Sequence, residues 1–297
     1  MASVTPGSPG AWIAGARLRT LPAAAGPVLA GGGLAWKDGG FAVAPFLAAL
    51  GAALLIQIGT NFANDYSDFA RGADTADRLG TPRVTQAGLL TASAVRLGAA
   101  VSFALAFAVG IYLAIVGGWP VVWIGVGSIL LAVSYTGGPW PYGYHGLGDL
   151  AVWILFGPVA VTGTYYVQLL RWVPEALIAG LGAGALATAI LVVNNLRDIT
   201  TDAAAGKRTL AVRIGPAATR VQYSLLITVA AAVPPVGVMA GWWPAGTLLA
   251  SGAVLFAAAP LRVVWTYENP RALNAALAAT ARTTGAWGLL FAVGCLW

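Results

Sequence analysis

Charged side chains are scarce in this chain of 297 residues: they make up 9% of it, whereas hydrophobic residues make up 59%. A soluble domain carries about 25% charged residues, so the composition excludes a water-soluble globular protein. The single cysteine, Cys295, excludes an internal disulfide framework and thiolate metal clusters, and the single histidine, His145, excludes a site of several histidines. Any chemistry must therefore use carboxylates, amides, hydroxyls and cations.

Basic residues are also few, although they outnumber the acidic ones. Sixteen Lys and Arg against ten Asp and Glu give a formal net charge of +6. They are too dispersed for a groove that follows a nucleic-acid backbone, so we expect no nucleic-acid partner and instead an anionic lipid or anionic substrate. A secretory signal peptide is not indicated, because Arg17 and Arg19 precede an apolar segment that continues as a span without a clear cleavage site.

Apolar runs long enough to cross a lipid bilayer recur along the whole chain. Charges and clusters of Pro and Gly divide them into nine predicted spans, near residues 20–36, 42–64, 92–116, 119–136, 148–170, 174–196, 217–240, 244–265 and 276–297. The predicted fold is an all-α polytopic membrane protein with one transmembrane domain over residues 1–297. Eight or ten spans are the alternative, since the first and last segments are poorly delimited.

Positive charge lies almost entirely on one side of this topology. If the N-terminus is cytoplasmic, every Lys and Arg except Lys37 and Arg171 falls in an inside loop or at its edge. The positive-inside rule therefore predicts a multi-pass protein of the plasma membrane with its N-terminus in the cytoplasm and its C-terminus outside.

An acidic motif occurs twice, at the inner ends of the second and sixth predicted spans. A constant offset pairs Asn61 with Asn195, Asn64 with Asp198, Asp68 with Asp202 and Gly72 with Gly206. Residues three and seven places after the first share one face of an α-helix, and Asp65 joins the first such face, so each span presents one polar stripe. Both spans run from outside to inside, which brings the stripes to the same depth, where they can face each other across one cavity.

The chemistry of these stripes points to a metal ion. Ionisable groups at membrane depth are costly and usually face a cavity, a partner or a pathway, and clustered carboxylates repel unless a cation lies between them. Oxygen ligands suit Mg²⁺, whose coordination shell substrate phosphates often complete. We therefore predict a site for magnesium and a diphosphate. The alternative, solvated helix ends, is disfavoured by the internal repeat.

Basic residues follow both motifs and would complement a diphosphate, because Arg makes paired contacts with phosphate and Lys a point-charge contact. Arg83 and Lys207 are the main candidates, with Arg19 as a further one. The amides of Asn61 and Asn195 are also predicted to bind substrate. The alternative for each basic residue is a topology signal, since inside loops are basic in any case.

A third polar stretch, residues 134–149, lies on the same side and is rich in aromatic residues, Gly and Pro. The rings of Tyr135 and Tyr142 are suited to stacking on a flat aromatic acceptor or to stabilising positive charge. Anchoring at the membrane interface is the alternative. Asp149 begins the next span, and we interpret it first as a residue of the first helical turn and second as a metal ligand.

On these motifs the sequence resembles the UbiA superfamily of intramembrane aromatic prenyltransferases over nearly the whole chain. The runs that carry the resemblance are Asn64-Asp65-Tyr66-Ser67-Asp68, Tyr135-Thr136-Gly137-Gly138-Pro139 and Asn194-Asn195-Leu196-Arg197-Asp198. They are most similar to the branch that acts on 1,4-dihydroxy-2-naphthoate in menaquinone biosynthesis. The resemblance implies nine helices around a central cavity, Mg²⁺ dependence and a polyprenyl diphosphate donor.

From this resemblance we hypothesise that two Mg²⁺ ions, Lys207 and Arg83 bind the donor diphosphate and stabilise it as a leaving group. The naphthoate ring then attacks the allylic cation and loses its carboxylate as CO₂, and oxidation of the product yields demethylmenaquinone. The metal ligands under this hypothesis are Asn64, Asp65, Asp68, Asp74, Asp198 and Asp202. The catalytic residues are Asp65, Asp68, Asp198, Asp202 and Lys207.

Two alternatives stay open. Another aromatic acceptor, such as 4-hydroxybenzoate, is the nearest competitor for the reaction. A membrane carrier is the competitor from a different class, although carriers usually place their sites on broken helices near the membrane midplane. The first motif also has Gly72 four residues after Asp68 and its next acid at Asp74, which leaves the ligand set of the first metal open.

Overall fold

The computed structural model describes residues 4–73, 79–81 and 83–297, and every regular element in them is a helix. In chain order the elements are α1 (Pro9–Ala16), η1 (Leu18–Thr20), α2 (Pro22–Lys37), α3 (Val43–Ala70), α4 (Ala92–Gly117), α5 (Trp119–Ser134), η2 (Tyr142–His145), α6 (Gly148–Ile154), η3 (Leu155–Val159), α7 (Ala160–Leu169), α8 (Pro174–Arg197), α9 (Ile199–Ala204), α10 (Leu210–Met239), η4 (Ala245–Thr247), α11 (Leu248–Ala253), η5 (Val254–Ala257), α12 (Ala258–Thr266), η6 (Pro270–Ala272) and α13 (Leu273–Gly294). The predicted all-α class is confirmed.

Six helical segments of the described chain are long and apolar enough to cross a membrane: Val43–Ala70, Ala92–Gly117, Gly148–Leu169, Pro174–Arg197, Leu210–Met239 and Ala245–Thr266. Helices α2, α5 and α13 occupy the three other segments that the sequence predicts as spans. The protein is a multi-pass membrane protein, while the count of nine spans stays a prediction.

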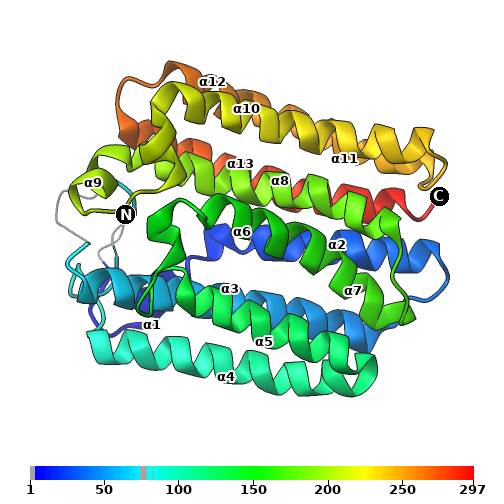
Figure 1. The fold of residues 1–297 in the computed structure, drawn as a ribbon, viewed down its shortest axis with the longest axis horizontal. Coiled ribbons are helices and arrows are strands. Elements are labelled where there is room, and N and C mark those ends of the chain that lie inside the picture. The colour runs from blue at the N-terminus through cyan, green and yellow to red at the C-terminus, as the bar shows by residue number, and fades with distance from the viewer. Residues whose placement is uncertain (1–3, 74–78, 82) are drawn as a thin grey trace.

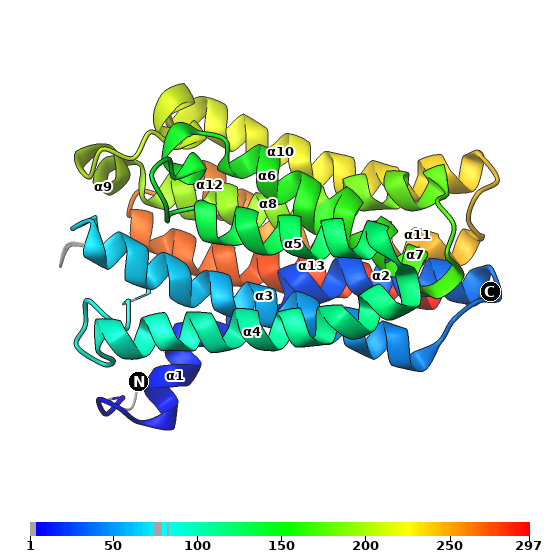
Figure 2. The ribbon, with the colours of Figure 1, turned by 60° about the horizontal axis from the view of Figure 1, so that its bottom comes forward.

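The long helices lie roughly parallel to one another along the longest axis of the molecule (Figure 1). Helix α8 packs against α10 and α13, α2 packs against α13 and α7, and α3 packs against α4. Two views turned by 60° agree that α9 and the start of the chain lie at one end of this bundle and the C-terminus at the other (Figure 2). We call the end that carries α9 the polar end, because both acidic motifs lie there.

Close packing around α8 depends on small side chains. A Cβ added to Gly157 would lie 2.4 Å from the carbonyl oxygen of Gly180 and 2.8 Å from Cα of Gly184, so the two backbones touch. Gly157 belongs to η3, a π-helical turn that contains Pro158. Proline has no N–H for the regular ladder, and such a wide turn accommodates it. The glycine-rich stretch of α8 therefore packs within the chain, as small residues in membrane helices do.

Candidate active site

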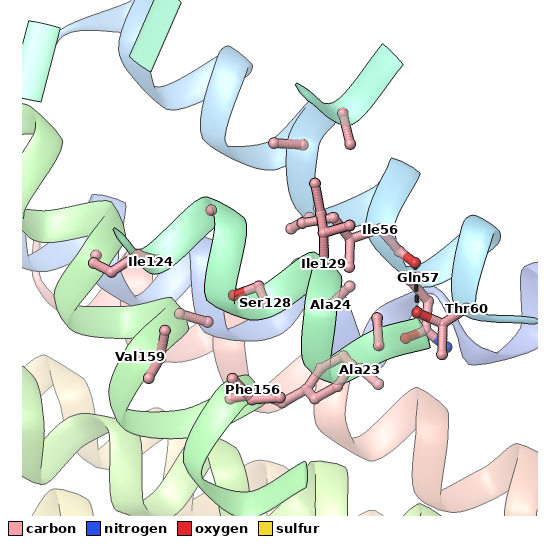
Figure 3. Close-up of a pocket in the computed structure, with 18 of the residues that line it drawn as sticks. Ala23, Ala24, Ile56, Gln57, Thr60, Ile124, Ser128, Ile129, Phe156 and Val159 are labelled. Carbon is pink, nitrogen blue, oxygen red and sulfur yellow. Dashed lines mark hydrogen bonds between the residues drawn. The ribbon is translucent and has the colours of Figure 1, made fainter. Parts of the chain in front are cut away.

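A cavity of about 450 Å³ lies between the helices α2 to α8. Its walls are mostly apolar, and in Figure 3 side chains such as Ala23, Ile56 and Phe156 surround it, with the polar Gln57 and Thr60 on α3. Polar residues also line its end nearest to the acidic motifs; these are Arg17, Asn61, Asn64, Arg83, Tyr135, Tyr142 and Asn194. The cavity thus joins one charged end to an apolar interior.

One wall of the cavity reaches the outer surface of the bundle. Phe107 and Ile111 on α4 line the cavity and are nevertheless 56% and 52% exposed. Because α4 is apolar enough to span a membrane, this surface faces lipid. A long apolar ligand can therefore extend from the cavity along α4 without meeting water.

Asp68 is the point at which the two acidic motifs meet. It is 1% exposed, and its Oδ2 lies 2.9 Å from Lys207 Nζ and 3.0 Å from Arg83 Nη2. The hydroxyl of Tyr144 donates a 2.7 Å hydrogen bond to Oδ1. Since Asp68 ends the first motif and Lys207 follows the second, the two segments that carry the motifs are in contact, while the shared cavity for their carboxylates stays a prediction.

The turn after the second motif directs Lys207 towards Asp68. The backbone N–H of Lys207 donates a 2.8 Å hydrogen bond to the carbonyl oxygen of Asp202. Gly206 has a φ of 73°, a left-handed conformation that glycine adopts without steric cost. The turn after α9 therefore requires glycine at position 206, independently of its match to Gly72 in the repeat.

Asp65 uses its carboxylate to hold a neighbouring loop. Backbone N–H groups of Val84 and Thr85 donate hydrogen bonds of 3.0 Å and 3.1 Å to its two oxygens, and Arg17 Nη2 lies 3.8 Å away. These contacts place Arg83 beside Asp68. Asp65 therefore has a positioning role in this structure, and its predicted role as a metal ligand stays a prediction.

Arg197, which directly precedes Asp198, pairs with that carboxylate at the buried end of α8. Its Nε and Nη2 lie 2.8 Å and 2.5 Å from the two oxygens of Asp198. The same guanidinium donates hydrogen bonds of 2.8 Å to Asn194 on the cavity wall and to Asn274 on α13, and Asn274 binds the carbonyl oxygen of Leu79 at 2.9 Å. The motif pattern assigns Arg197 no role at the site, although its position directly before a motif carboxylate is a sequence signal for an ion pair with it.

Of the other predicted binding residues, some line the cavity and others do not. Asn61 and Asn64 line the cavity, whereas on α8 it is Asn194 rather than Asn195 that does so. Arg19 is exposed on η1 and absent from the described cavity wall, where Arg17 stands instead. Asp74 lies outside the described residues, so its predicted metal role has no structural counterpart here.

The stretch of residues 134–149, which is rich in aromatic residues, contributes three tyrosines to the polar end of the molecule. Tyr135 and Tyr142 line the cavity with their rings in an edge-to-face contact, 5.5 Å between centroids. Burial raises the pKa of Tyr142 to about 12, so its hydroxyl keeps its proton at neutral pH. Tyr144 is not among the predicted site residues. It lies under Lys207, whose Nζ is 4.8 Å from the centroid of the tyrosine ring.

The donor set fits a magnesium ion by its chemistry. Carboxylate and amide oxygens of Asn64, Asp68, Asp198 and Asp202 belong to the two motif ends that Lys207 and Asp68 bring together, and Mg²⁺ prefers such hard ligands. Within the described ranges, no group of three carboxylates gathers in a ready metal cluster. Asp68 and Asp198 are paired with cations instead.

Comparison with known proteins identifies the family. A model of the UbiA prenyltransferase family matches residues 24–295, and the chain therefore belongs to this family of prenyltransferases. The 1,4-dihydroxy-2-naphthoate octaprenyltransferase of Mycobacterium tuberculosis is 45% identical over 261 residues, which cover 84% of this chain and 86% of the relative.

Solved structures have the same fold. The apo structure of a UbiA homolog from Aeropyrum pernix K1 matches with a TM-score of 0.69 and 15% identity, covering 92% of this chain and 96% of the other. A UbiA homolog from Archaeoglobus fulgidus, bound to DMAPP and Mg²⁺, matches with a TM-score of 0.65 and 13% identity, covering 95% and 99%. At these identities the likeness concerns the fold.

Proposed function

We propose that this prenyltransferase transfers a polyprenyl group from polyprenyl diphosphate to 1,4-dihydroxy-2-naphthoate, with loss of CO₂ and diphosphate, to give demethylmenaquinol, whose separate oxidation yields demethylmenaquinone. The observation that carries the proposal is the contact of Lys207 with Asp68, which also pairs with Arg83 at the polar end of an otherwise apolar cavity. The relative that acts on 1,4-dihydroxy-2-naphthoate, at 45% identity, supports this choice of acceptor.

The polar end holds the diphosphate of the donor. Lys207 and Arg83, which Asp68 keeps together, reorient their cations towards the phosphate oxygens. Two bound magnesium ions would supply positive charge that makes the diphosphate a better leaving group. The residues that would hold them are Asn64, Asp65, Asp68, Asp74, Asp198 and Asp202.

The apolar cavity controls what the prenyl group meets. Water is excluded by its aliphatic walls, so the allylic carbon that develops positive charge reacts with the acceptor ring and not with water. Tyr135 and Tyr142 line the cavity close to the diphosphate end and present π faces and hydroxyls to the acceptor. The rest of the polyprenyl chain passes along α4 towards lipid. We place the polar end in the cytoplasm and the protein in the plasma membrane, as the charge distribution favours.

The test incubates the detergent-purified protein with a prenyl diphosphate, 1,4-dihydroxy-2-naphthoate and Mg²⁺ and reads the products by mass spectrometry. We expect a product with the mass of the acceptor plus the prenyl group minus CO₂, with one diphosphate released per product. A membrane carrier would release no diphosphate, and that result would refute the enzyme assignment. Consumption of 4-hydroxybenzoate while the naphthoate stays inert would refute only the acceptor.

A further inference from the structure

Asp149 is a buried carboxylate that the proposed reaction does not use. The residue is 6% exposed, and Gln222 on α10 donates a 3.1 Å hydrogen bond to its Oδ1. Its other oxygen, Oδ2, is buried and has no hydrogen-bond partner within the described chain. A buried carboxylate oxygen without a donor is costly, so a native protein that keeps one has a use for it.

The place of Asp149 on α6 puts it next to the cavity. Val152 lies three residues further on, on the same face of the helix, and lines the cavity, as does Phe156 in the following turn. Asp149 therefore stands at the start of the cavity-facing side of α6, directly after the loop that carries Tyr135 and Tyr142.

Tyr135 is the residue through which Asp149 can act on a ligand in the cavity. Its ring packs on Gly148, where an added Cβ would lie 3.2 Å from the tyrosine hydroxyl, so that hydroxyl is beside the residue preceding Asp149. Tyr135 thus lines the cavity and places its hydroxyl, a hydrogen-bond donor, beside Gly148, the residue that precedes Asp149.

We propose that Asp149 is a positioning residue for the aromatic acceptor. When the acceptor binds, Oδ2 of Asp149 accepts a hydrogen bond from the Tyr135 hydroxyl, and the oxygen of Tyr135 accepts one from a hydroxyl of the acceptor. The acceptor is thus recognised as a phenol, and the hydrogen bond makes its ring richer in electrons at the carbon that is alkylated. This inference rests on the proposed function and concerns the same site.

The test is a double-mutant cycle on the purified protein, with the acceptor varied at saturating donor and Mg²⁺. Asp149→Asn and Tyr135→Phe each lower kcat/KM for the acceptor about 10- to 100-fold, as expected for one hydrogen bond to a charged group, and leave KM for the donor within about twofold. The double variant is no worse than Tyr135→Phe, because both changes break one chain of hydrogen bonds. Leu150→Ala, an exposed neighbour on α6, is the matched control and behaves as the unchanged protein.

Three outcomes would overturn the inference: wild-type acceptor kinetics in Asp149→Asn, multiplying effects in the double variant, or an equal rise in KM for the donor. If Asp149→Asn does not fold, Tyr135→Phe decides alone, since it keeps the ring on Gly148 and removes only the hydroxyl. Unchanged acceptor kinetics in that variant would equally overturn it. A wild-type protein that forms no prenylated naphthoate would instead mark a failure of the proposed function.

Discussion

The ammonium group of Lys207 lies 2.9 Å from the carboxylate of Asp68, and this contact joins the ends of the two helices that carry the repeated motif. The residues are far apart in the sequence and belong to different copies of the repeat. Their pairing turns two polar helix ends into one site at the mouth of an apolar cavity.

Lys207→Ala removes the cation that follows the second motif and contacts Asp68 of the first. We expect kcat/KM for the prenyl diphosphate to fall by about 100-fold or more, because a positioned charge on a leaving group is worth several kcal/mol, while the protein stays folded in detergent. Lys207→Arg should recover part of the loss, since the charge remains with a different reach. Arg262→Ala, which changes an exposed basic residue in the middle of α12, is the control, and equal losses in both variants would contradict the role of Lys207.

Asp65→Asn tests whether this residue positions the loop that carries Arg83. An amide has one acceptor oxygen in place of two, so either the Val84 or the Thr85 N–H loses its partner, a cost of about 1–3 kcal/mol for a buried group. We expect faster hydrogen exchange at Val84 and Thr85 and a lower affinity for the diphosphate. Unchanged exchange at these two amides would show that the loop is held by something else.

Arg197→Ala leaves the carboxylate of Asp198 buried without its paired cation. Breaking a buried ion pair by removing one partner costs about 3–5 kcal/mol, so Tm measured in detergent should fall clearly. Arg197→Lys restores the charge without the two-pronged contact and should recover only part of the stability. Arg208→Ala, with an exposed side chain, should leave Tm nearly unchanged; a similar Tm for both alanine variants would refute this account.

Gly157→Ala tests the backbone contact between η3 and α8. The added methyl group would collide with Gly180, and overpacking of this kind costs about 1–3 kcal/mol. Gly163→Ala on α7 is the matched control, because its nearest neighbour is Ile124 Cδ1 at an ordinary 3.6 Å. We expect a lower Tm for the first variant only, and equal thermal stability of the two would contradict the packing described here.

Asp38, at the end of the molecule opposite to the acidic motifs, should make the stability of the protein depend on pH. Burial raises the pKa of Asp38, but contacts from Lys37, Tyr165 and Arg171 outweigh it and hold that pKa below the ordinary 3.8. The folded protein therefore binds this proton less readily than the unfolded chain does. The contribution of Asp38 to the free energy of unfolding is complete above pH of about 4 and is lost as the pH falls through the pKa of the folded state.

The measurement compares Tm of the wild type and Asp38→Asn in detergent over a range of pH. The wild type should be the more stable protein at neutral pH, and the difference should shrink below pH of about 4. A difference that stays constant or grows towards acid would show that the carboxylate does not carry this charge-dependent stability.

Much of the architecture and part of the site were predictable because they depend on short-range physics. The length of an apolar run decides whether a helix can cross a membrane, and each predicted span lies on one helix or on a run of consecutive helical elements. Two spans that run in the same direction must bring equivalent positions to the same depth, which is why the convergence of Asp68 with the second motif could be foreseen. The resemblance of the motifs to a known family added the expected reaction, the Mg²⁺ dependence and the polyprenyl diphosphate donor.

The remaining parts of the site could not be read from the sequence, because they depend on how distant loops fold onto the helix ends. Nothing in the spacing distinguishes Arg17 from Arg19, yet Arg17 adopts a φ of 52° and turns towards Asp65, while Arg19 is exposed. In the same way, nothing in the spacing predicts that Lys207 lies over the ring of Tyr144 or that Arg197 donates a hydrogen bond to Asn274.

The amino-acid sequence by itself determined the membrane class, the helices and the two matching acidic stripes, since hydropathy and helical periodicity act over a few turns. Only the tertiary structure decided which carboxylate pairs with which cation and which side chains reach the cavity. The reason is physical: a buried charge must find its partner wherever the packed chain places one, and that partner is set by contacts between segments far apart in the sequence.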